Sequence, residues 1–260
     1  MLEIAATLHR GKVARQQQDA LLIHDTIHQT SNVRIITQCL TDDTLLAVAD
    51  GLYSSPLARR ASRIVLDALL QMAGESHPQR LQDGGFITGW HLRRVQEHLA
   101  QRLAHQRESY GAASTLALAQ VRGRRAVILN IGDSRVYRTT GDGQWQRLSK
   151  DHTVLQGLID CGKASPDQEY ASLYGMLEHA LCADAEATDF AIHCALITLA
   201  VGDRLVLCSD GIHDTLGEER MWALFDPLRG GVEQVGIWRD AVWQRGAPDN
   251  FSLIVAAVTA

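Results

Sequence analysis

Two stretches of the chain carry apolar residues at the spacing of an amphipathic helix. One runs from Pro56 to Met72 and the other from Trp90 to Gln106, and in both the apolar positions recur every three or four residues. That spacing gathers the apolar side chains into one stripe along the helix. We therefore predict two helices that each pack one face against a hydrophobic surface.

Short apolar runs rich in β-branched residues, bounded by polar turns, indicate strands elsewhere. The predicted strands are Ala20 to Ile23, Val33 to Gln38, Leu45 to Ala49, Thr115 to Gln120, Ala126 to Ile131, Arg135 to Thr139, Arg204 to Cys208 and Phe251 to Val258. Glycine-containing turns at 122–124 and 141–143 separate two pairs of apolar runs and predict hairpins. Because hairpins join antiparallel strands, we expect largely antiparallel sheets.

The predicted helices come in blocks between runs of strands and do not alternate with them one by one. This order favours an α+β layered sandwich over a doubly wound parallel sheet. No low-complexity or linker-like stretch divides the 260 residues, so we expect a single domain over residues 1–260. The segment 151–189 has no strong period and should form an irregular excursion from the sandwich.

Composition narrows the class of protein. The hydrophobic fraction of 46% and the charged fraction of 21% are ordinary for a globular protein, and the net charge of −5 disfavours a nucleic-acid partner. The segment from Met1 to Lys12 lacks the apolar core of a signal peptide. The longest apolar stretch, near residues 194–202, is too short to span a bilayer. We expect a cytoplasmic monomer without a membrane partner.

Cysteine and histidine do not point to a metal site. The five cysteines include no Cys-x-x-Cys pair, so we expect neither disulfides nor a zinc knuckle, and we predict that they pack as small buried hydrophobes. His91, His98 and His105 fall on one stripe of the second predicted helix, and His24 and His28 fall on a strand and its turn. For both sets we expect a surface role in place of metal ligation.

Aspartates at the ends of predicted strands are the most informative feature. They are Asp50, Asp133, Asp210 and Asp249. A carboxylate beside a buried strand is costly, and several together repel one another, whereas a bound divalent cation removes that conflict. Oxygen-only ligation suits Mg²⁺ or Mn²⁺ better than zinc. A single Asp-Gly pair is more often a hairpin turn, but four acids in one setting favour a metal site, where Gly51 and Gly211 would let backbone approach the ion.

The acids belong to short motifs that occur in a fixed order from about Gly11 to the C-terminus. These are Val-Ala-Asp-Gly at 48–51, the segment 111–115, Asn-Ile-Gly-Asp-Ser-Arg-Val-Tyr at 130–137, the segment 148–152, the segment 202–211 with Leu-Cys-Ser-Asp-Gly at its end, and Asp-Asn-Phe-Ser at 249–252. On these motifs the sequence resembles the PPM, or protein phosphatase 2C-like, family. The resemblance implies a four-layer α/β/β/α sandwich with two antiparallel sheets at its centre and a metal cleft at one end.

The resemblance also implies roles for single residues in holding two ions. Asp50 would bridge the two ions, with the Gly51 carbonyl on one of them. Asp19 would contribute to the second ion, through water. Asp210 and Asp249 would complete the first.

A third, weaker ion would be shared by Asp133 and Asp210. The activity that the resemblance implies is hydrolysis of phosphoserine and phosphothreonine on proteins by a water that the ions activate. Asp50 and Asp210 would be catalytic residues in that sense. The substrates would be phosphorylated proteins, and bacterial relatives commonly oppose Hanks-type kinases.

The first motif departs from the family, which places a phosphate-binding arginine three residues after the glycine that here is Gly11. Position 14 is alanine, and Arg15 lies one residue late. A shift of one residue in a strand reverses the side-chain direction, so Arg15 is a candidate phosphate ligand with a surface charge as the alternative. His152 is a candidate general acid, with a structural hydrogen bond as the alternative. The segment from Leu155 to Glu178 corresponds to the family's flap beside the cleft.

Two other interpretations stay open from sequence. A fold of this type that binds a phosphoprotein without turnover is suggested by the displaced Arg15, although such a chain would not need to keep mutually repelling acids. Another metal-dependent phosphoesterase, a nuclease or a sugar phosphatase, would use the same metal chemistry. The acidic net charge disfavours the nuclease.

Overall fold

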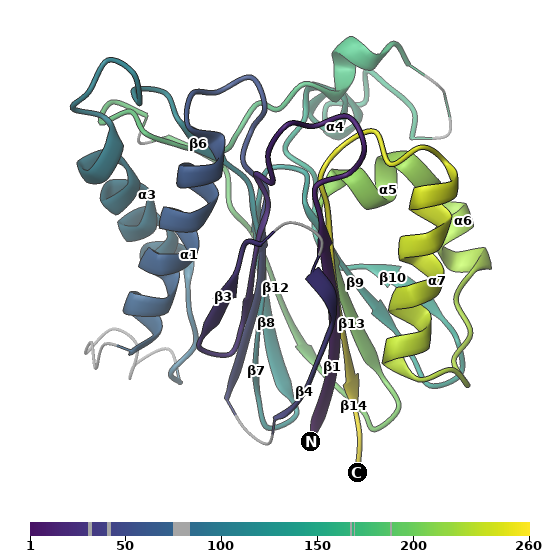
Figure 1. Cartoon of the computed structure of the whole chain (residues 1–260). Coiled ribbons are helices and arrows are strands. Elements are labelled where there is room, and N and C mark those ends of the chain that lie inside the picture. Colours follow the sequence, from purple (N-terminus) through teal and green to yellow (C-terminus); the bar gives the residue numbers. More distant parts are fainter. Residues whose placement is uncertain (31–32, 41–42, 75–83, 167, 169, 188) are drawn as a thin grey trace.

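The structure is a computed structural model that describes residues 1–30, 33–40, 43–74, 84–166, 168, 170–187 and 189–260. Within these residues two six-stranded sheets pack face to face, and helices cover both outer surfaces (Figure 1). All neighbouring strands within each sheet are antiparallel. The predicted α+β architecture, a four-layer α/β/β/α sandwich, is confirmed.

The first sheet has the strand order β10-β9-β13-β14-β1-β4. Its strands are β1 (Leu2–His9), β4 (Val33–Leu40), β9 (Arg135–Thr139), β10 (Trp145–Arg147), β13 (Arg204–Cys208) and β14 (Phe251–Val258). β1 and β14 pair along their whole length, from Leu2 opposite Val258 to His9 opposite Phe251. The loop that follows β1 therefore meets the residues that precede β14 at one end of the sheet.

The second sheet has the strand order β12-β8-β7-β5-β2-β3. Its strands are β2 (Ala20–Ile23), β3 (Thr26–His28), β5 (Thr44–Ala49), β7 (Leu116–Arg122), β8 (Arg125–Ile131) and β12 (His193–Thr198). A separate short pair joins β6 (Ala113–Ser114) to β11 (Leu181–Cys182). Both predicted hairpins are present, one between β7 and β8 and one between β9 and β10.

Helices α1 (Ala58–Gly74) and α3 (Gly89–Leu103) cover the outer face of the second sheet, as predicted, with ends shifted by at most three residues. Their apolar stripes are buried against that face. Within the described ranges, no helix is long and apolar enough to cross a bilayer.

Helices α5 (Asp210–Leu216), α6 (Glu218–Ala223) and α7 (Gly231–Gln244) cover the first sheet and were not predicted. The fully buried Trp238 anchors α7, and its indole N–H donates to the carbonyl of Met221 at 2.9 Å. Two features of the sequence explain why α5 and α7 were not predicted. Glycines at the start and inside of α7 weaken its helical propensity, and α5 begins so soon after β13 that its Asp-Gly start is typical of a turn.

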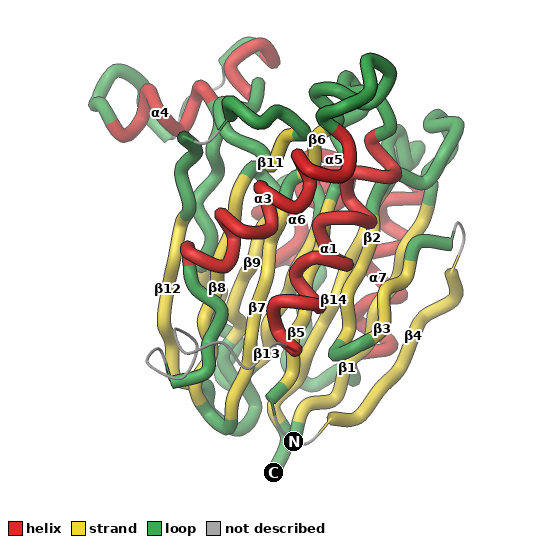
Figure 2. The backbone as a smooth tube through the Cα atoms, turned by 90° about the vertical axis from the view of Figure 1, so that its left-hand side faces the viewer, coloured by secondary structure: helices red, strands yellow, loops and turns green. Residues whose placement is uncertain are grey.

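The strands of both sheets run between the end of the molecule that carries α4 (Val154–Asp160) and the opposite end, where the two chain termini lie (Figures 1 and 2). Side chains from the inner faces of both sheets fill the interior, among them Ile4, Leu46, Ile128 and Ile254. Among the described residues of the segment 151–189, the only helices and strands are α4, the short helix η1 (Ser172–Gly175) and β11, which agrees with the predicted irregular excursion. The loops at the α4 end are where the strand-end aspartates lie.

The cysteine prediction is wrong in part. Cys208 is buried in β13, but Cys39, Cys161 and Cys194 are exposed, and all five cysteines are free. The two on β-strands 4 and 12 sit on the outermost strands of their sheets, where neighbours cover only one side.

The surface prediction is also wrong for His91. Its side chain is only 1% exposed, and its Nδ1 accepts a hydrogen bond from the Thr88 backbone N–H at 3.1 Å, which closes the first turn of α3. His98 is half-buried, and His105 is exposed. A regular spacing on a helix placed these residues on one stripe but did not reveal that the start of the stripe is covered.

Candidate metal centre

Four aspartates from separate parts of the chain line one cleft of about 370 Å³. They are Asp50, Asp133, Asp210 and Asp249. Asp50 directly follows β5, and Asp133 lies in the turn between β8 and β9. Asp210 is the first residue of α5, and Asp249 precedes β14. Strand ends of both sheets thus bring together the acids that the sequence analysis singled out, with Gly51 beside them.

Asp19 lies beneath this cleft and is fully buried. Its Oδ2 atom accepts hydrogen bonds from the hydroxyl groups of Ser209, at 2.8 Å, and Ser252, at 2.6 Å. Its Oδ1 atom receives none from the N–H and hydroxyl groups of the described residues, and the Asp50 carboxyl is in contact with Asp19. One carboxylate oxygen of a buried acid is therefore left without a compensating donor, which is costly in the absence of a cation.

The carboxylates raise one another's pKa values. Burial raises the pKa of Asp19 to about 6, against hydrogen bonds from two hydroxyl groups that lower it. Burial and the charge of Asp210 raise the pKa of Asp133 to about 7, and burial raises the pKa of Asp210 itself to about 7. The pKa of Asp50 lies well above its ordinary value, because of burial first and then the charges of Asp19 and Asp210. Asp50 and Asp210 are within hydrogen-bonding distance of each other.

The donor set fits a hard divalent cation. In the part of the chain that the structure describes, no group of three His, Cys, Asp or Glu side chains could already hold an ion as the side chains stand. Among the described residues that line the cleft, the charged side chains are nevertheless all aspartates, whose oxygen atoms are the ligands that Mg²⁺ and Mn²⁺ prefer. A cation between Asp50 and Asp210 would offset the cost of burying their negative charge, and this burial is the largest cause of both raised pKa values.

The side chain of Asn250 joins the loop after β1 to the start of β14 by hydrogen bonds to backbone groups, a role that the sequence analysis did not predict. Its Oδ1 accepts from the Gln18 N–H at 2.5 Å, and its Nδ2 donates to the Arg10 carbonyl at 2.7 Å. Gly11, in the same loop, has φ +77°, and a Cβ there would lie 2.1 Å from the Asp249 carbonyl oxygen. Only glycine allows the loop after β1 to approach Asp249 so closely.

The glycines after two of the aspartates serve close packing of backbone. A Cβ on Gly51 would lie 2.3 Å from the carbonyl oxygen of Ala58, at the start of α1. A Cβ on Gly211 would lie 1.9 Å from the carbonyl oxygen of Asn250. This adds a structural reason for both glycines to the predicted one, which was close approach of the backbone to an ion.

Thr115 connects two of the acidic segments. Its backbone N–H donates to the Asp50 carbonyl at 2.8 Å, and its hydroxyl accepts from the Asp50 N–H at 3.1 Å. The same hydroxyl lies 2.8 Å from the hydroxyl of Ser134, the neighbour of Asp133. The only sequence signal for this role was the position of Thr115 at the end of the 111–115 motif.

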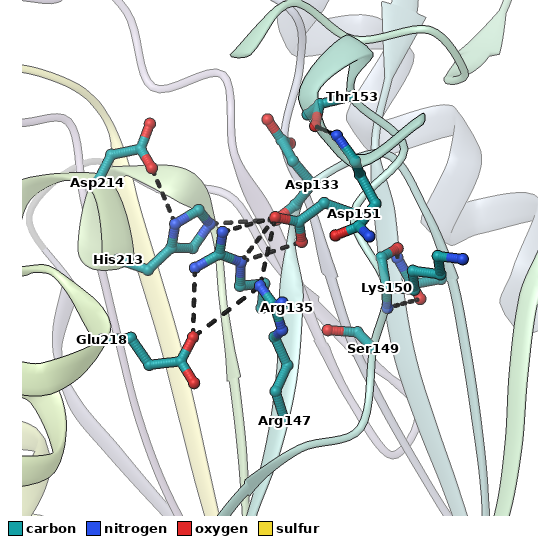
Figure 3. Close-up of polar contacts among 12 residues, drawn as sticks. Asp133, Arg135, Arg147, Ser149, Lys150, Asp151, Thr153, His213, Asp214 and Glu218 are labelled. Atoms are coloured by element: carbon teal, nitrogen blue, oxygen red, sulfur yellow. Dashed lines mark hydrogen bonds and ion pairs between the residues drawn. The ribbon is translucent and has the colours of Figure 1, made fainter. Parts of the chain in front are cut away.

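Behind the cleft, Arg135 and Asp151 form a bidentate ion pair (Figure 3). The guanidinium group donates to Asp151 Oδ1 at 3.0 Å and to Oδ2 at 2.6 Å, and the two side chains are 17% and 9% exposed. Burial alone would raise the pKa of Asp151, but the hydrogen bonds and charge of Arg135 lower it below its ordinary value. This pair fixes the segment 148–152 against β9.

His213, on α5, fixes the backbone next to the Asp133 carboxylate (Figure 3). Its Nε2 lies 3.1 Å from the Asp133 carbonyl oxygen, which can only accept, so the imidazole N–H donates. Its Nδ1 lies 2.9 Å from the carboxylate of Asp214. The helix that begins at Asp210 is thereby tied to the turn that carries Asp133.

Arg15 is placed differently from what the sequence analysis assumed. It lies in the loop between β1 and β2 and not in a strand, so the argument from alternating side-chain direction does not apply. Its side chain is exposed, and it is not one of the residues that line the aspartate cleft. Its role as a phosphate ligand stays a prediction.

His152 is buried, and its Nδ1 accepts a hydrogen bond from the Gly132 N–H at 3.0 Å. Burial, followed by the neighbouring imidazoles of His179 and His193, lowers the pKa of His152 to about 4. It lines a neighbouring pocket with these two histidines and is not one of the residues that line the aspartate cleft. This geometry supports the structural hydrogen bond over the role of general acid.

The family of the chain follows from comparison with known proteins. Residues 17–241 match the family model described as Protein phosphatase 2C. The chain belongs to the protein phosphatase 2C family. A relative in Mycobacterium tuberculosis, the serine/threonine protein phosphatase PstP, is 26% identical over 219 residues, which are 82% of this chain and 40% of PstP. The chain thus spans less than half the length of that relative.

Two further similarities agree with this family. The serine/threonine phosphatase Stp of Listeria innocua is 24% identical over 215 residues, covering 81% of this chain and 83% of Stp. A solved structure of the catalytic domain of PstP in complex with two manganese ions matches with a TM-score of 0.74 and 24% identity, covering 100% of both chains. At that identity the structural match shows the protein phosphatase 2C fold.

Removing the negative charges of Asp50 and Asp210 should stabilise the metal-free protein. We expect Asp50→Asn/Asp210→Asn to raise the free energy of unfolding by about 1–3 kcal/mol at pH 7.5 in EDTA. The same variant should lose the rise in melting temperature that millimolar Mn²⁺ gives the wild type. Urea and thermal unfolding measure both effects. A variant that is less stable than the wild type in EDTA would contradict this view of the site.

The pH dependence of stability should carry the signature of the raised carboxyl pKa values. Asp19, Asp133 and Asp210 have folded-state pKa values of about 6 to 7, against an ordinary 3.8, so the folded state holds more protons than the unfolded chain between these limits. Their contribution to stability is therefore fully present below about pH 4 and is lost as the pH rises to about 7. The lowered pKa of His152 acts in the opposite direction.

The comparison between wild type and Asp50→Asn/Asp210→Asn isolates the carboxylates, because His152 is common to both. In EDTA the stability advantage of the variant should grow from near zero at pH 4 to its largest value above pH 7, as followed by urea unfolding. An advantage that does not change with pH would show that the raised pKa values are not its cause.

Breaking the buried ion pair should cost more than breaking an exposed one. Asp151→Asn leaves the Arg135 charge buried without its carboxylate, and we expect a loss of about 3 kcal/mol in urea unfolding. The control is Asp160→Asn, which removes the 43% exposed partner of Lys150 and should change stability by less than about 0.5 kcal/mol. Equal effects of the two substitutions would refute the structural role of the Arg135–Asp151 pair.

Proposed function

We propose that this chain is a Mn²⁺- or Mg²⁺-dependent protein phosphatase that hydrolyses phosphoserine and phosphothreonine on proteins. The observation that carries the proposal is the cleft in which four aspartates from separate segments meet above the buried Asp19. Membership of the protein phosphatase 2C family and the names of the relatives PstP and Stp, both serine/threonine phosphatases, support it.

The residues proposed to hold two ions are those of the cleft floor. Asp50 would bridge them, the Gly51 carbonyl, Asp210 and Asp249 would complete the coordination of one, and Asp19 would act on the other through water. When bound, the ions would lower the pKa of a water molecule and neutralise the charge of the phosphoryl group, so that water can attack phosphorus. The two manganese ions in the PstP complex support this number.

Neutral groups of the chain hold the proposed ion ligands in position. Thr115 holds the backbone of Asp50, and the hydroxyl groups of Ser209 and Ser252 hold one oxygen of Asp19. We do not assign the role of general acid to His152, because its Nδ1 accepts a hydrogen bond within the fold.

The charge of the cleft favours an enzyme over a phosphoprotein-binding module. Among the described residues that line the cleft, the charged side chains are all aspartates, and lysine, arginine and histidine are absent. Such a cleft repels a phosphate group unless cations are bound. A cleft that accepts phosphate only through its cations also contains what hydrolysis requires, whereas a binding module would use arginine or lysine.

Several finer features belong to the same proposal. Asp133, with Asp210, would hold a third ion, and residues 155–178, with 167 and 169 outside the described residues, would form a flap beside the cleft of a single domain over 1–260. We further propose that the protein acts in the cytoplasm as a monomer on phosphoproteins made by a Hanks-type kinase. Family resemblance supports these features.

The proposal predicts Mn²⁺-dependent turnover. The wild type should hydrolyse p-nitrophenyl phosphate and a phosphothreonine peptide with millimolar Mn²⁺ and should lose this activity in EDTA. Asp50→Asn and Asp210→Asn should each lower kcat about 100-fold or more, because each removes a proposed ion ligand.

The matched control is Asp240→Asn, which makes the same change in charge at a side chain that is 61% exposed on α7. It should retain wild-type kcat. If Mn²⁺ stabilises the wild type but no substrate is turned over, the non-catalytic binding interpretation replaces the phosphatase.

A further inference from the structure

The aspartate cleft has an apolar rim made by two separate segments. Leu52 and Tyr53 follow β5, and Met176 and Leu177 follow η1; all four line the cleft. Tyr53 is 78% exposed and Met176 is 57% exposed. Single exposed apolar side chains are common on protein surfaces, but large ones from distant segments at the mouth of one polar cleft indicate a surface that another molecule covers.

Backbone hydrogen bonds hold both segments of the rim in place. The Leu52 N–H donates to the Ala113 carbonyl at 3.0 Å, and the Ser55 N–H donates back to the Leu52 carbonyl at 2.8 Å. On the other side, the Val154 N–H donates to the Met176 carbonyl at 2.9 Å, and Leu177 pairs with Thr153 as a β-bridge. The exposed apolar side chains are therefore presented from fixed backbone.

The rim lies where the part of a substrate next to the phosphoryl group must lie. With the phosphoryl group at the aspartates, the phosphorylated residue lies in the cleft that Tyr53 and Met176 line, and the adjoining residue of the substrate lies within reach of these exposed side chains. Consecutive Cα atoms are about 3.8 Å apart, so the residues that flank the phosphorylated one lie close to the mouth of the cleft. No basic side chain is found among the described residues that line the cleft, so nothing there attracts an acidic neighbour.

We propose that Tyr53 and Met176 form a subsite for an apolar side chain directly adjacent to the phosphoserine or phosphothreonine of the substrate. The subsite rests on the proposed phosphatase function and narrows its substrates to phosphorylated segments with an apolar residue beside the phosphorylated one. The apolar neighbour buries surface against the tyrosine ring and the methionine side chain.

The test compares three phosphothreonine peptides that differ only in the two residues flanking the phosphothreonine. Both flanking residues are leucine in the first peptide, serine in the second and aspartate in the third. With Mn²⁺, the wild type should show a kcat/KM for the leucine peptide about 10-fold above that for the serine peptide, the value expected for partial burial of one apolar side chain. The aspartate peptide should be the poorest of the three.

Two variants locate the preference. Tyr53→Ser and Met176→Ser should each bring the leucine-to-serine ratio of kcat/KM to within about 3-fold of one, whereas Tyr53→Phe, which keeps the ring, should preserve it. The control Leu228→Ser changes a side chain that is 93% exposed and does not line the cleft, and it should leave the ratio unchanged. Because both target side chains are exposed, the variants should fold, and the Mn²⁺-dependent rise in melting temperature verifies this.

The outcomes separate the two proposals. If no peptide is hydrolysed by the wild type, the phosphatase function fails. If all peptides are hydrolysed with equal kcat/KM, or if the preference survives both Tyr53→Ser and Met176→Ser, the phosphatase function stands and the subsite is overturned. Loss of the preference together with a change from dimer to monomer in light scattering would assign the rim to a second copy of this chain and would also overturn it.

Discussion

The repulsion between carboxylates at the floor of the cleft is the constraint on which the rest of the site depends. Asp50 and Asp210 lie within hydrogen-bonding distance of each other, and Asp19 lies buried in contact with Asp50. No local preference of the chain would place these groups together. Strand pairing within each sheet, and the apolar interior between the two sheets, hold the strand ends together in spite of the negative charge of the aspartates.

Neutral groups make this arrangement rigid. Hydroxyl groups of Ser209 and Ser252 satisfy one oxygen of Asp19, Thr115 holds the backbone of Asp50, and Asn250 joins the loop after β1 to the start of β14. None of these contacts neutralises the negative charge. The fold therefore positions the carboxylates without compensating their charge, which is the arrangement that the proposed metal-assisted hydrolysis requires.

Much of the fold, and the four aspartates of the cleft, could be predicted from the sequence because the signals were local. The two long helices, eight strands, two hairpins and four strand-end aspartates each depend on residues close together in the chain. The predictions failed where packing decided the outcome. His91 is covered at the start of α3, three cysteines are exposed, α5 begins with an Asp-Gly pair that is typical of a turn, and Arg15 lies in a loop and not in a strand.

The sequence by itself determined the fold class and the chemical nature of the site, because the period of apolar residues sets each element and the residue type sets the ligand atoms. Only the tertiary structure decided which groups meet. It placed Asp19 beside Asp50, the hydroxyl groups of Ser209 and Ser252 against Asp19, and Tyr53 and Met176 in the lining of one cleft. Such contacts join segments that are far apart in the chain, and their geometry depends on strand register and side-chain packing, which no local pattern contains.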